Sequence, residues 1–246
     1  MSMVKRLFLL MIALAIVLAV AGGIYLVRSV RDMERIVAFG RRTEARYGDL
    51  ARRIEWSPPP TGRLEAAARW EGWLQVRERL IAATPPELDD LAYQVLDEDY
   101  DPGLLGRIML VRSIEPHMQD PIDAHLEALE EHRMSPLEYR WLTGMAIKGA
   151  LARPERFAAG RAYGQLIDRL IVLGRGFVRR SALLDPGRIP DAGFVRRMIG
   201  EEFGEHPPPP DWALDRLDSR RESAYLFDLL VVAIEARFWT GREGAP

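Results

Sequence analysis

The chain has 246 residues, a formal net charge of −2 at pH 7 and no cysteine. The lack of cysteine excludes disulfide bonds, thiolate metal sites and a cysteine nucleophile. The slightly acidic balance argues against a nucleic-acid-binding protein, because such proteins present a basic surface to the phosphates. We therefore expect no nucleic-acid partner.

An uncharged apolar stretch, LFLLMIALAIVLAVAGGIYLV, begins at Leu7 and ends at Val27. At about 1.5 Å of helical rise per residue, it is long enough to cross a hydrocarbon core of about 30 Å. A tail of residues 1–6, with two basic side chains, precedes it. The sequence therefore predicts a single-pass transmembrane helix over residues 7–27, with the lipid bilayer as its partner.

The processing and orientation of this segment leave alternatives open. Residues 19–21, Ala-Val-Ala, precede two glycines and are typical of a signal-peptide cleavage site. The apolar run continues past them to spanning length, which favours an uncleaved signal-anchor over cleavage after Ala21. The basic residues on the two sides are close in number, but the short tail favours a cytoplasmic N-terminus. We expect an anchor in the bacterial inner membrane and a periplasmic soluble domain.

Two connecting segments follow the apolar stretch. Residues 28–56 place apolar side chains at helical spacing, which predicts a helical stalk that leaves the membrane. Residues 57–62, SPPPTG, end it, because three prolines cannot continue a helix and favour an extended hinge. Residues 63–246 are then predicted to form the soluble helical domain.

Helix starts recur along the first half of this domain. An apolar stripe predicts a helix over residues 64–83. After it, prolines repeatedly follow a residue that can cap a helix, which is the arrangement of a helix start. The spacing predicts short helices joined by tight turns. The starts are Thr84-Pro85, Asp101-Pro102, Asp120-Pro121 and Ser135-Pro136, the last being a capping box completed by Glu138.

The second half of the domain is also patterned as helices. A helix over residues 155–184 contains Gly160 and Gly164, a small-residue face that another helix can approach closely. Four prolines at 207–210 predict a rigid spacer, and residues 211–239 predict one continuous helix. No segment alternates with period two. The predicted fold class is all-α, an N-terminal transmembrane helix followed by an irregular bundle of about six to eight helices.

The charges of the domain are separated along the sequence. Residues 85–140 carry 14 acids and 4 bases, whereas residues 141–200 carry 4 acids and 11 bases. We expect the two blocks to face each other or water. A basic cluster containing Arg175, Arg179 and Arg180 is a candidate contact for anionic lipid head groups or an acidic partner.

Motifs for catalysis or metal binding are weak. His117, His125 and His132 fall within the acidic block, but the last two are two helical turns apart, about 10 Å, and cannot easily share an ion. The acidic run 97–101 resembles the start of a calcium loop, but Pro102 stands where a glycine is required. Hydrolase, phosphate-loop and dinucleotide motifs do not occur. The sequence predicts no catalytic, cofactor or metal site and favours a non-enzymatic protein, with a metal-dependent hydrolase as an alternative.

Four aromatic residues, Trp70, Trp73, Tyr139 and Trp141, are candidate partner contacts, because large amphipathic rings suit helix–helix and partner interfaces. The last two lie in the capped start SPLEYRW. Together with the earlier L-Q-V-R sequence at residues 74–77, this start resembles uncharacterised bacterial membrane-anchored helical proteins that pair L-x-V-R with S/T-x-x-E-Y-x-W. The resemblance implies a membrane-anchored helical protein and no activity. Ordinary core packing behind a good cap is the alternative interpretation.

Taken in order, an anchor, a stalk, a hinge and a helical domain predict a membrane-tethered interaction or scaffold domain of the bacterial cell envelope. Its expected partner is an envelope protein or a second copy of the chain. A lipid or apolar-ligand carrier is the alternative, with the aromatic residues and the face of Gly160 and Gly164 lining a groove.

Overall fold

The computed structural model describes residues 34–35, 38–59, 67–90, 103–181, 206–218 and 221–233. Within these ranges every regular element is a helix and no strand occurs, which confirms the all-α class. None of the described helices is both long and apolar enough to cross a membrane. The predicted transmembrane segment, residues 7–27, lies outside the described residues.

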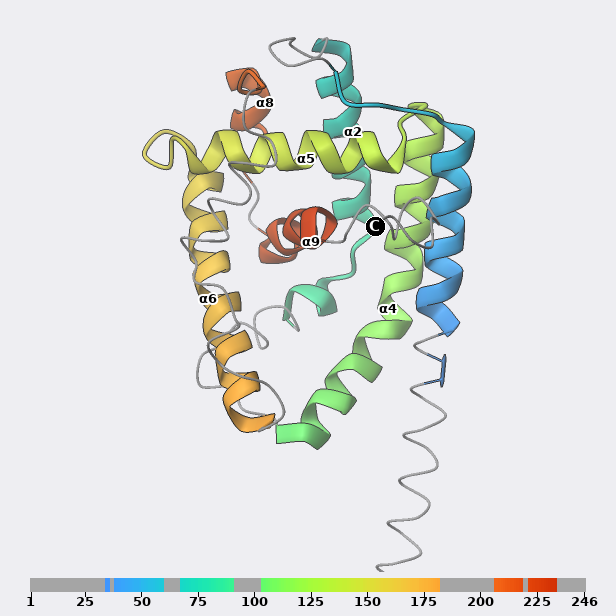
Figure 1. Cartoon of the computed structure of the whole chain (residues 1–246), viewed down its shortest axis with the longest axis vertical. Helices are drawn as coiled ribbons and strands as arrows, with labels where there is room; N and C mark the ends of the chain where they lie inside the picture. Colours follow the sequence, from blue (N-terminus) through green and yellow to red (C-terminus); the bar gives the residue numbers. More distant parts are fainter. Residues whose placement is uncertain are drawn as a thin grey trace, which may run out of the picture. The chain divides into compact units, whose positions relative to one another are not determined.

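The chain divides into two compact units, residues 1–42 and residues 43–246. In the second unit, α5 crosses the domain. Helix α4 precedes the N-terminal end of α5, and α6 follows its C-terminal end (Figure 1). Helix α9 packs against α5 and α6, while α2 packs against α4, α5 and α8. The bounds are α2 Ala67–Ala83, α4 Gly103–Glu131, α5 Pro136–Leu151, α6 Ala158–Ser181, α8 Asp211–Asp215 and α9 Glu222–Ala233.

Helix α5 is the centre of the fold because nearly its whole circumference is buried. Its sequence, PLEYRWLTGMAIKGAL, carries few charges and several small residues, so other helices can surround it. Ser135 begins the helix as predicted, with its side chain accepting from the backbone N–H of Leu137 at 3.4 Å. Both carboxylate oxygens of Glu138, which was predicted to complete the capping box, accept from the Arg69 guanidinium of α2.

The corner between α5 and α6 depends on Gly160. A Cβ atom at this position would lie 2.1 Å from the carbonyl oxygen of Ala150 and 3.1 Å from the Cα of Pro154. The backbone of α6 therefore approaches the end of α5 more closely than any side chain permits. The predicted small-residue face thus has a contact within the chain at Gly160.

Helix α4 differs from the prediction, because Asp120-Pro121 does not begin a new helix. The helix runs through this pair without interruption from Gly103 to Glu131. A proline inside a helix costs roughly 3 kcal/mol, whereas full burial of a large aliphatic side chain contributes about 1.5–3 kcal/mol. The residues that follow, Ile122, Leu126 and Leu129, are all buried, so packing outweighs the proline cost. Figure 1 shows α4 bent along its length, as prolines cause.

The prediction of one helix over residues 211–239 is also wrong. Helix α8 ends at Asp215 and α9 begins at Glu222, although no glycine or proline lies between them. Two arginines in the break bind α2 and the turn after it. Arg216 donates to the carboxylates of Glu71 and Glu78. Arg221 donates to the carbonyls of Ile81 and Thr84, at 2.7 and 2.8 Å, and so caps the end of α2.

The helix before the proline-rich segment is part of the domain surface. Residues 38–53 are helical, and residues 54–59 are not, so the stalk helix ends three residues before the predicted boundary at 56. Tyr47 and Leu50 are buried. Arg46 pairs with Asp123 of α4, and Arg53 pairs with Glu130 of α4, each at 2.5 Å. Residues 43–53 therefore belong to the same compact unit as α4.

Ion pairs at the surface of the domain neutralise part of the acidic block. Its described carboxylates pair with arginines of residues 43–53, of α2 and of the α8–α9 break. The pairs are Arg46–Asp123, Arg53–Glu130, Arg69–Glu138, Arg79–Glu131 and Arg221–Asp89. From the basic block, Arg153 and Arg156 instead bind Asp211.

We expect Gly160→Ala to destabilise the domain by about 1–3 kcal/mol or more, because the new methyl group collides with backbone rather than with a movable side chain. Gly72→Ala in α2 is the matched control, since its Cβ would lie 3.6 Å or more from its neighbours. Thermal unfolding followed by circular dichroism measures both. Equal midpoints for the two variants would contradict the close approach at Gly160.

Candidate functional site

A buried ion pair lies at the centre of the second unit. Arg77 of α2 and Asp228 of α9 are each 2 % exposed. The Arg77 Nε donates to Oδ2 of Asp228 at 2.9 Å and to Oδ1 at 3.2 Å. The Arg77 Nη2 lies 2.9 Å from Oδ2, but without the alignment of a hydrogen bond. Residues 151 positions apart in the sequence thus share one interior site.

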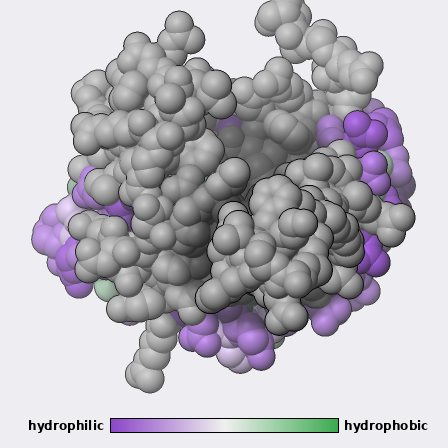
Figure 2. All heavy atoms as spheres, turned by 90° about the horizontal axis from the view of Figure 1, so that it is seen from below, coloured by the Kyte–Doolittle hydropathy of each residue, from purple (hydrophilic) through white to green (hydrophobic). Residues whose placement is uncertain are grey.

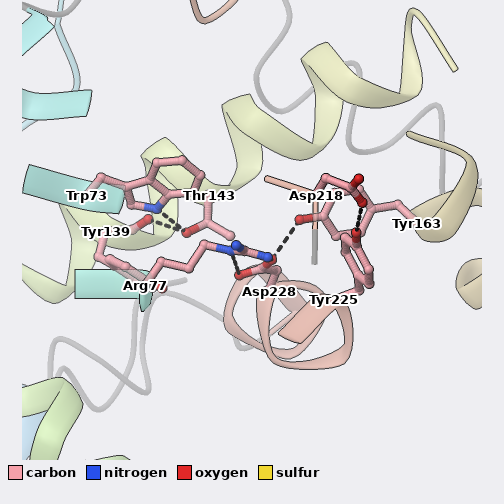
Figure 3. A network of polar contacts seen from close by, with 8 residues as sticks. All are labelled: Trp73, Arg77, Tyr139, Thr143, Tyr163, Asp218, Tyr225 and Asp228. Atoms are coloured by element: carbon pink, nitrogen blue, oxygen red, sulfur yellow. Dashed lines mark hydrogen bonds and ion pairs between the residues drawn. The ribbon is translucent and has the colours of Figure 1, made fainter. Parts of the chain in front are cut away.

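Helix α6 adds a phenol to this pair. The Tyr163 hydroxyl donates to Oδ2 of Asp228 at 2.7 Å (Figure 3). Its ring packs edge-on against Tyr225, with centroids 5.1 Å apart, and the Tyr225 hydroxyl donates to Asp218. The carboxylate of Asp228 therefore joins side chains from α2, α6 and α9.

The electrostatics of this site keep the Arg77 guanidinium charged and the Tyr163 hydroxyl protonated. Burial acts to lower the pKa of Arg77, but the carboxylate of Asp228 outweighs it, so the pKa is raised and the guanidinium stays charged. Burial, assisted by the negative charge of Asp228, raises the pKa of Tyr163 and keeps its hydroxyl a donor. The pair is neutral as a whole, which makes it a poor attractor for a free ion.

Beside the ion pair, α2 and α5 are joined by a shorter polar chain. The indole Nε1 of Trp73 donates to the Thr143 hydroxyl at 2.9 Å. The Thr143 hydroxyl donates to the Tyr139 carbonyl at 2.7 Å, which closes the chain on α5 (Figure 3). Because Trp73 and Thr143 are fully buried, these bonds satisfy groups that water cannot reach.

A second buried polar group connects residues 43–53 with α4 and α5. The Tyr47 hydroxyl and the His125 Nδ1 are 2.7 Å apart and share a hydrogen bond whose donor depends on the imidazole tautomer. The His125 ring packs edge-on against Tyr139, with centroids 4.5 Å apart. Burial lowers the pKa of His125 to about 3, so its imidazole is neutral at physiological pH.

Several buried polar atoms of this interior have no hydrogen-bond partner among the described residues. They include the Tyr139 hydroxyl, the Nε2 of His125 and the indole Nε1 of Trp70. An unpaired buried polar group costs roughly 1–3 kcal/mol, so such atoms usually meet water or a ligand.

The aromatic residues predicted as partner contacts lie in the interior of the unit. Trp70, Trp73 and Tyr139 are at most 2 % exposed, and Trp141 is 8 % exposed. Trp70 packs edge-on against Trp73, and Trp141 contacts Trp56 and His206. Within this chain these rings therefore contact its own helices. Arg175, Arg179 and Arg180 have their backbones in α6, but their side chains lie outside the described residues.

The three histidines of the acidic block do not converge. His125 is buried between two tyrosines, whereas His117 and His132 are half-buried. Among the described side chains, no group of three or more histidines, aspartates and glutamates is placed to hold a metal ion. The acidic run 97–101 lies outside the described residues.

The two residues of the ion pair, Arg77 and Asp228, were not predicted as site residues from the sequence. A signal was present, because Asp228 is the one carboxylate within the apolar run AYLFDLLVVA. Arg77 follows Trp70, Trp73 and Leu74 at helical spacing, on what is otherwise an apolar stripe. When two apolar helix faces each contain a single charged residue of opposite sign, the two residues are expected to form a buried ion pair. An isolated charge in the interior would cost too much free energy.

The described surface is mostly hydrophilic, as the coloured atoms of Figure 2 show for one face. The exception is Trp212 of α8, which is 38 % exposed and is the one exposed large hydrophobic residue in the described part of the chain. It follows Asp211, which binds Arg153 at 2.7 Å and Arg156 at 2.6 Å. Pro208, four residues earlier, is also exposed.

No protein-family model matches the chain, and no curated protein or solved structure is significantly similar to it. The resemblance of the Ser135 helix start to membrane-anchored helical proteins therefore remains a prediction.

We expect Asp228→Ala to lower the free energy of unfolding by about 3–5 kcal/mol, because it leaves the Arg77 charge buried without its partner. The double variant Arg77→Met/Asp228→Leu removes both charges and should recover much of that loss. Glu131→Ala, which breaks an exposed ion pair with Arg79, is the control and should cost less than about 1 kcal/mol. Denaturant titration measures all three. A double variant no more stable than Asp228→Ala would contradict a penalty due to the unpaired charge.

Proposed function

We propose that this protein is a membrane-tethered all-α interaction domain of the bacterial cell envelope, held to the inner membrane by residues 7–27. The observation that carries the proposal is the combination of a spanning-length apolar sequence with a docked helix that follows it. Residues 43–53 are tied to α4 by a buried hydrogen bond and two ion pairs. A membrane segment followed by a helix that packs on the domain would hold the domain near the membrane.

The surface around Trp212 supports an interaction role. Tryptophan and arginine are enriched among the residues that dominate binding energies at protein interfaces. Trp212 is exposed on α8, and the neighbouring Asp211 is held by two arginines. Binding to Arg153 lowers the pKa of Asp211, so this carboxylate is ionised at neutral pH. We propose this surface, defined by Pro208, Trp212 and Arg156, as the contact for an envelope protein.

A carrier of a small ligand is the second candidate, and one observation favours it. Among the described residues, the buried Tyr139 hydroxyl and the buried Trp70 indole have no hydrogen-bond partner. A ligand with an apolar body and a polar atom would satisfy them. Native mass spectrometry of the purified full chain distinguishes this candidate, since it requires a co-purified small molecule that denaturation releases.

We expect a photo-crosslinking amino acid at position 212 to give a discrete adduct with an envelope protein in intact bacteria. The same amino acid at Ala82, an exposed position in α2, is the matched control and should give none. Immunoblotting and mass spectrometry of the adduct provide the measurement. The same adducts at both positions, or none at 212, would contradict the proposed contact surface.

Membrane orientation provides a separate prediction. With residues 7–27 as an uncleaved anchor and a periplasmic domain, added protease should degrade the domain in spheroplasts and not in intact cells. The mature N-terminus should be Met1 or Ser2. A domain that resists protease until the inner membrane is lysed, or a protein that begins at Gly22, would contradict this arrangement.

A further inference from the structure

The contact between residues 43–53 and α4 has one buried polar centre. Tyr47, Gly48 and Leu50 are buried on the inner face of this helix. Arg46–Asp123 and Arg53–Glu130 lie at the edges, with side chains that are 38–62 % exposed. Exposed ion pairs of this kind contribute little. The attachment therefore depends on the apolar contact and on the hydrogen bond between Tyr47 and His125.

This centre accepts a neutral imidazole and disfavours a charged one. The groups that face His125 are phenols, Tyr47 from residues 43–53 and Tyr139 from α5. The nearest edge charges, Arg46 and Asp123, pair with each other. A protonated His125 would carry a proton on both nitrogens, and its buried Nε2 has no acceptor among the described residues. A positive charge here is thus uncompensated.

Removal of the helix changes these conditions. Tyr47 covers His125 from the side of residues 43–53. When that helix leaves α4, the imidazole gains water and can hold a proton. We propose that residues 43–53 form an acid-released latch, which is docked on α4 while His125 is neutral and detaches when His125 is protonated.

The direction of the pH dependence follows from linkage. Burial lowers the pKa of His125 to about 3 in the docked state, whereas an exposed histidine titrates near 6.5. The released state therefore binds more protons, and docking weakens as the pH falls below about 6.5 and until it reaches about 3. Within this window each pH unit shifts the equilibrium up to tenfold toward release. The contact between Arg77 and Asp228 does not involve His125, so we expect the rest of the core to stay folded. This latch does not depend on the proposed function.

The test uses the absence of cysteine in the full chain. Ala45→Cys and Asp120→Cys, both at exposed positions, introduce spin labels on the latch helix and on α4. The labelled full-length protein is placed in lipid nanodiscs, and pulsed electron resonance measures the label distance between pH 7.5 and 4.5. We expect one short distance at pH 7.5 and a longer population that grows as the pH falls. Helical circular dichroism recorded in parallel should not change.

The matched control is Tyr47→Phe/His125→Phe in the same labelled chain. It replaces the hydrogen-bonded pair by apolar rings of similar shape and removes the titrating group. This variant should keep the short distance throughout the pH range. The proposal is overturned if the native pair of helices stays docked at pH 4.5, if the control releases equally, or if the distance changes only together with loss of helical structure.

Discussion

The buried pair of Arg77 and Asp228 is the interaction on which the rest of the domain depends. It joins α2 to α9, and through Tyr163 it also holds α6. Such a pair adds little net stability relative to apolar packing, but breaking it costs several kcal/mol. It therefore acts as a constraint on how the helices assemble, because any arrangement that separates the two residues leaves two uncompensated charges in the interior. The central position of α5 follows, since it packs between the helices that the pair unites.

Local sequence patterns predicted the helix boundaries that depend on residues close in sequence. They failed at the boundaries that depend on contacts between distant residues. The all-α class and the Ser135 cap follow from periodicity and from hydrogen bonding within a few residues. The continuity of α4 could not be predicted in this way, because the burial of aliphatic residues outweighs the cost of Pro121. The break after α8 could not be predicted either, because it depends on the binding of Arg216 and Arg221 to α2 and the turn after it. The site was missed for a related reason. Its two charged residues are far apart in sequence, and only their placement on apolar faces marks them.

The interior thus contains two polar groups of different character. The first is a buried ion pair that joins α2, α6 and α9. The second is neutral, joins residues 43–53 to α4, and contains the one described histidine whose charge is suppressed by burial. In the proposed latch, the contact of residues 43–53 with α4 responds to pH, whereas the core around Arg77 and Asp228 stays assembled. A domain stabilised through the first group can thus release residues 43–53 through the second without unfolding.

Native-state hydrogen exchange of the full-length protein, read by mass spectrometry at increasing denaturant, tests the central role of the ion pair most directly. If Arg77 and Asp228 hold the assembly together, amides of α2, α5 and α9 should open in one cooperative step with the same free energy and the same denaturant dependence. Exchange of α9 at a clearly lower free energy, while α2 and α5 remain protected, would contradict the account.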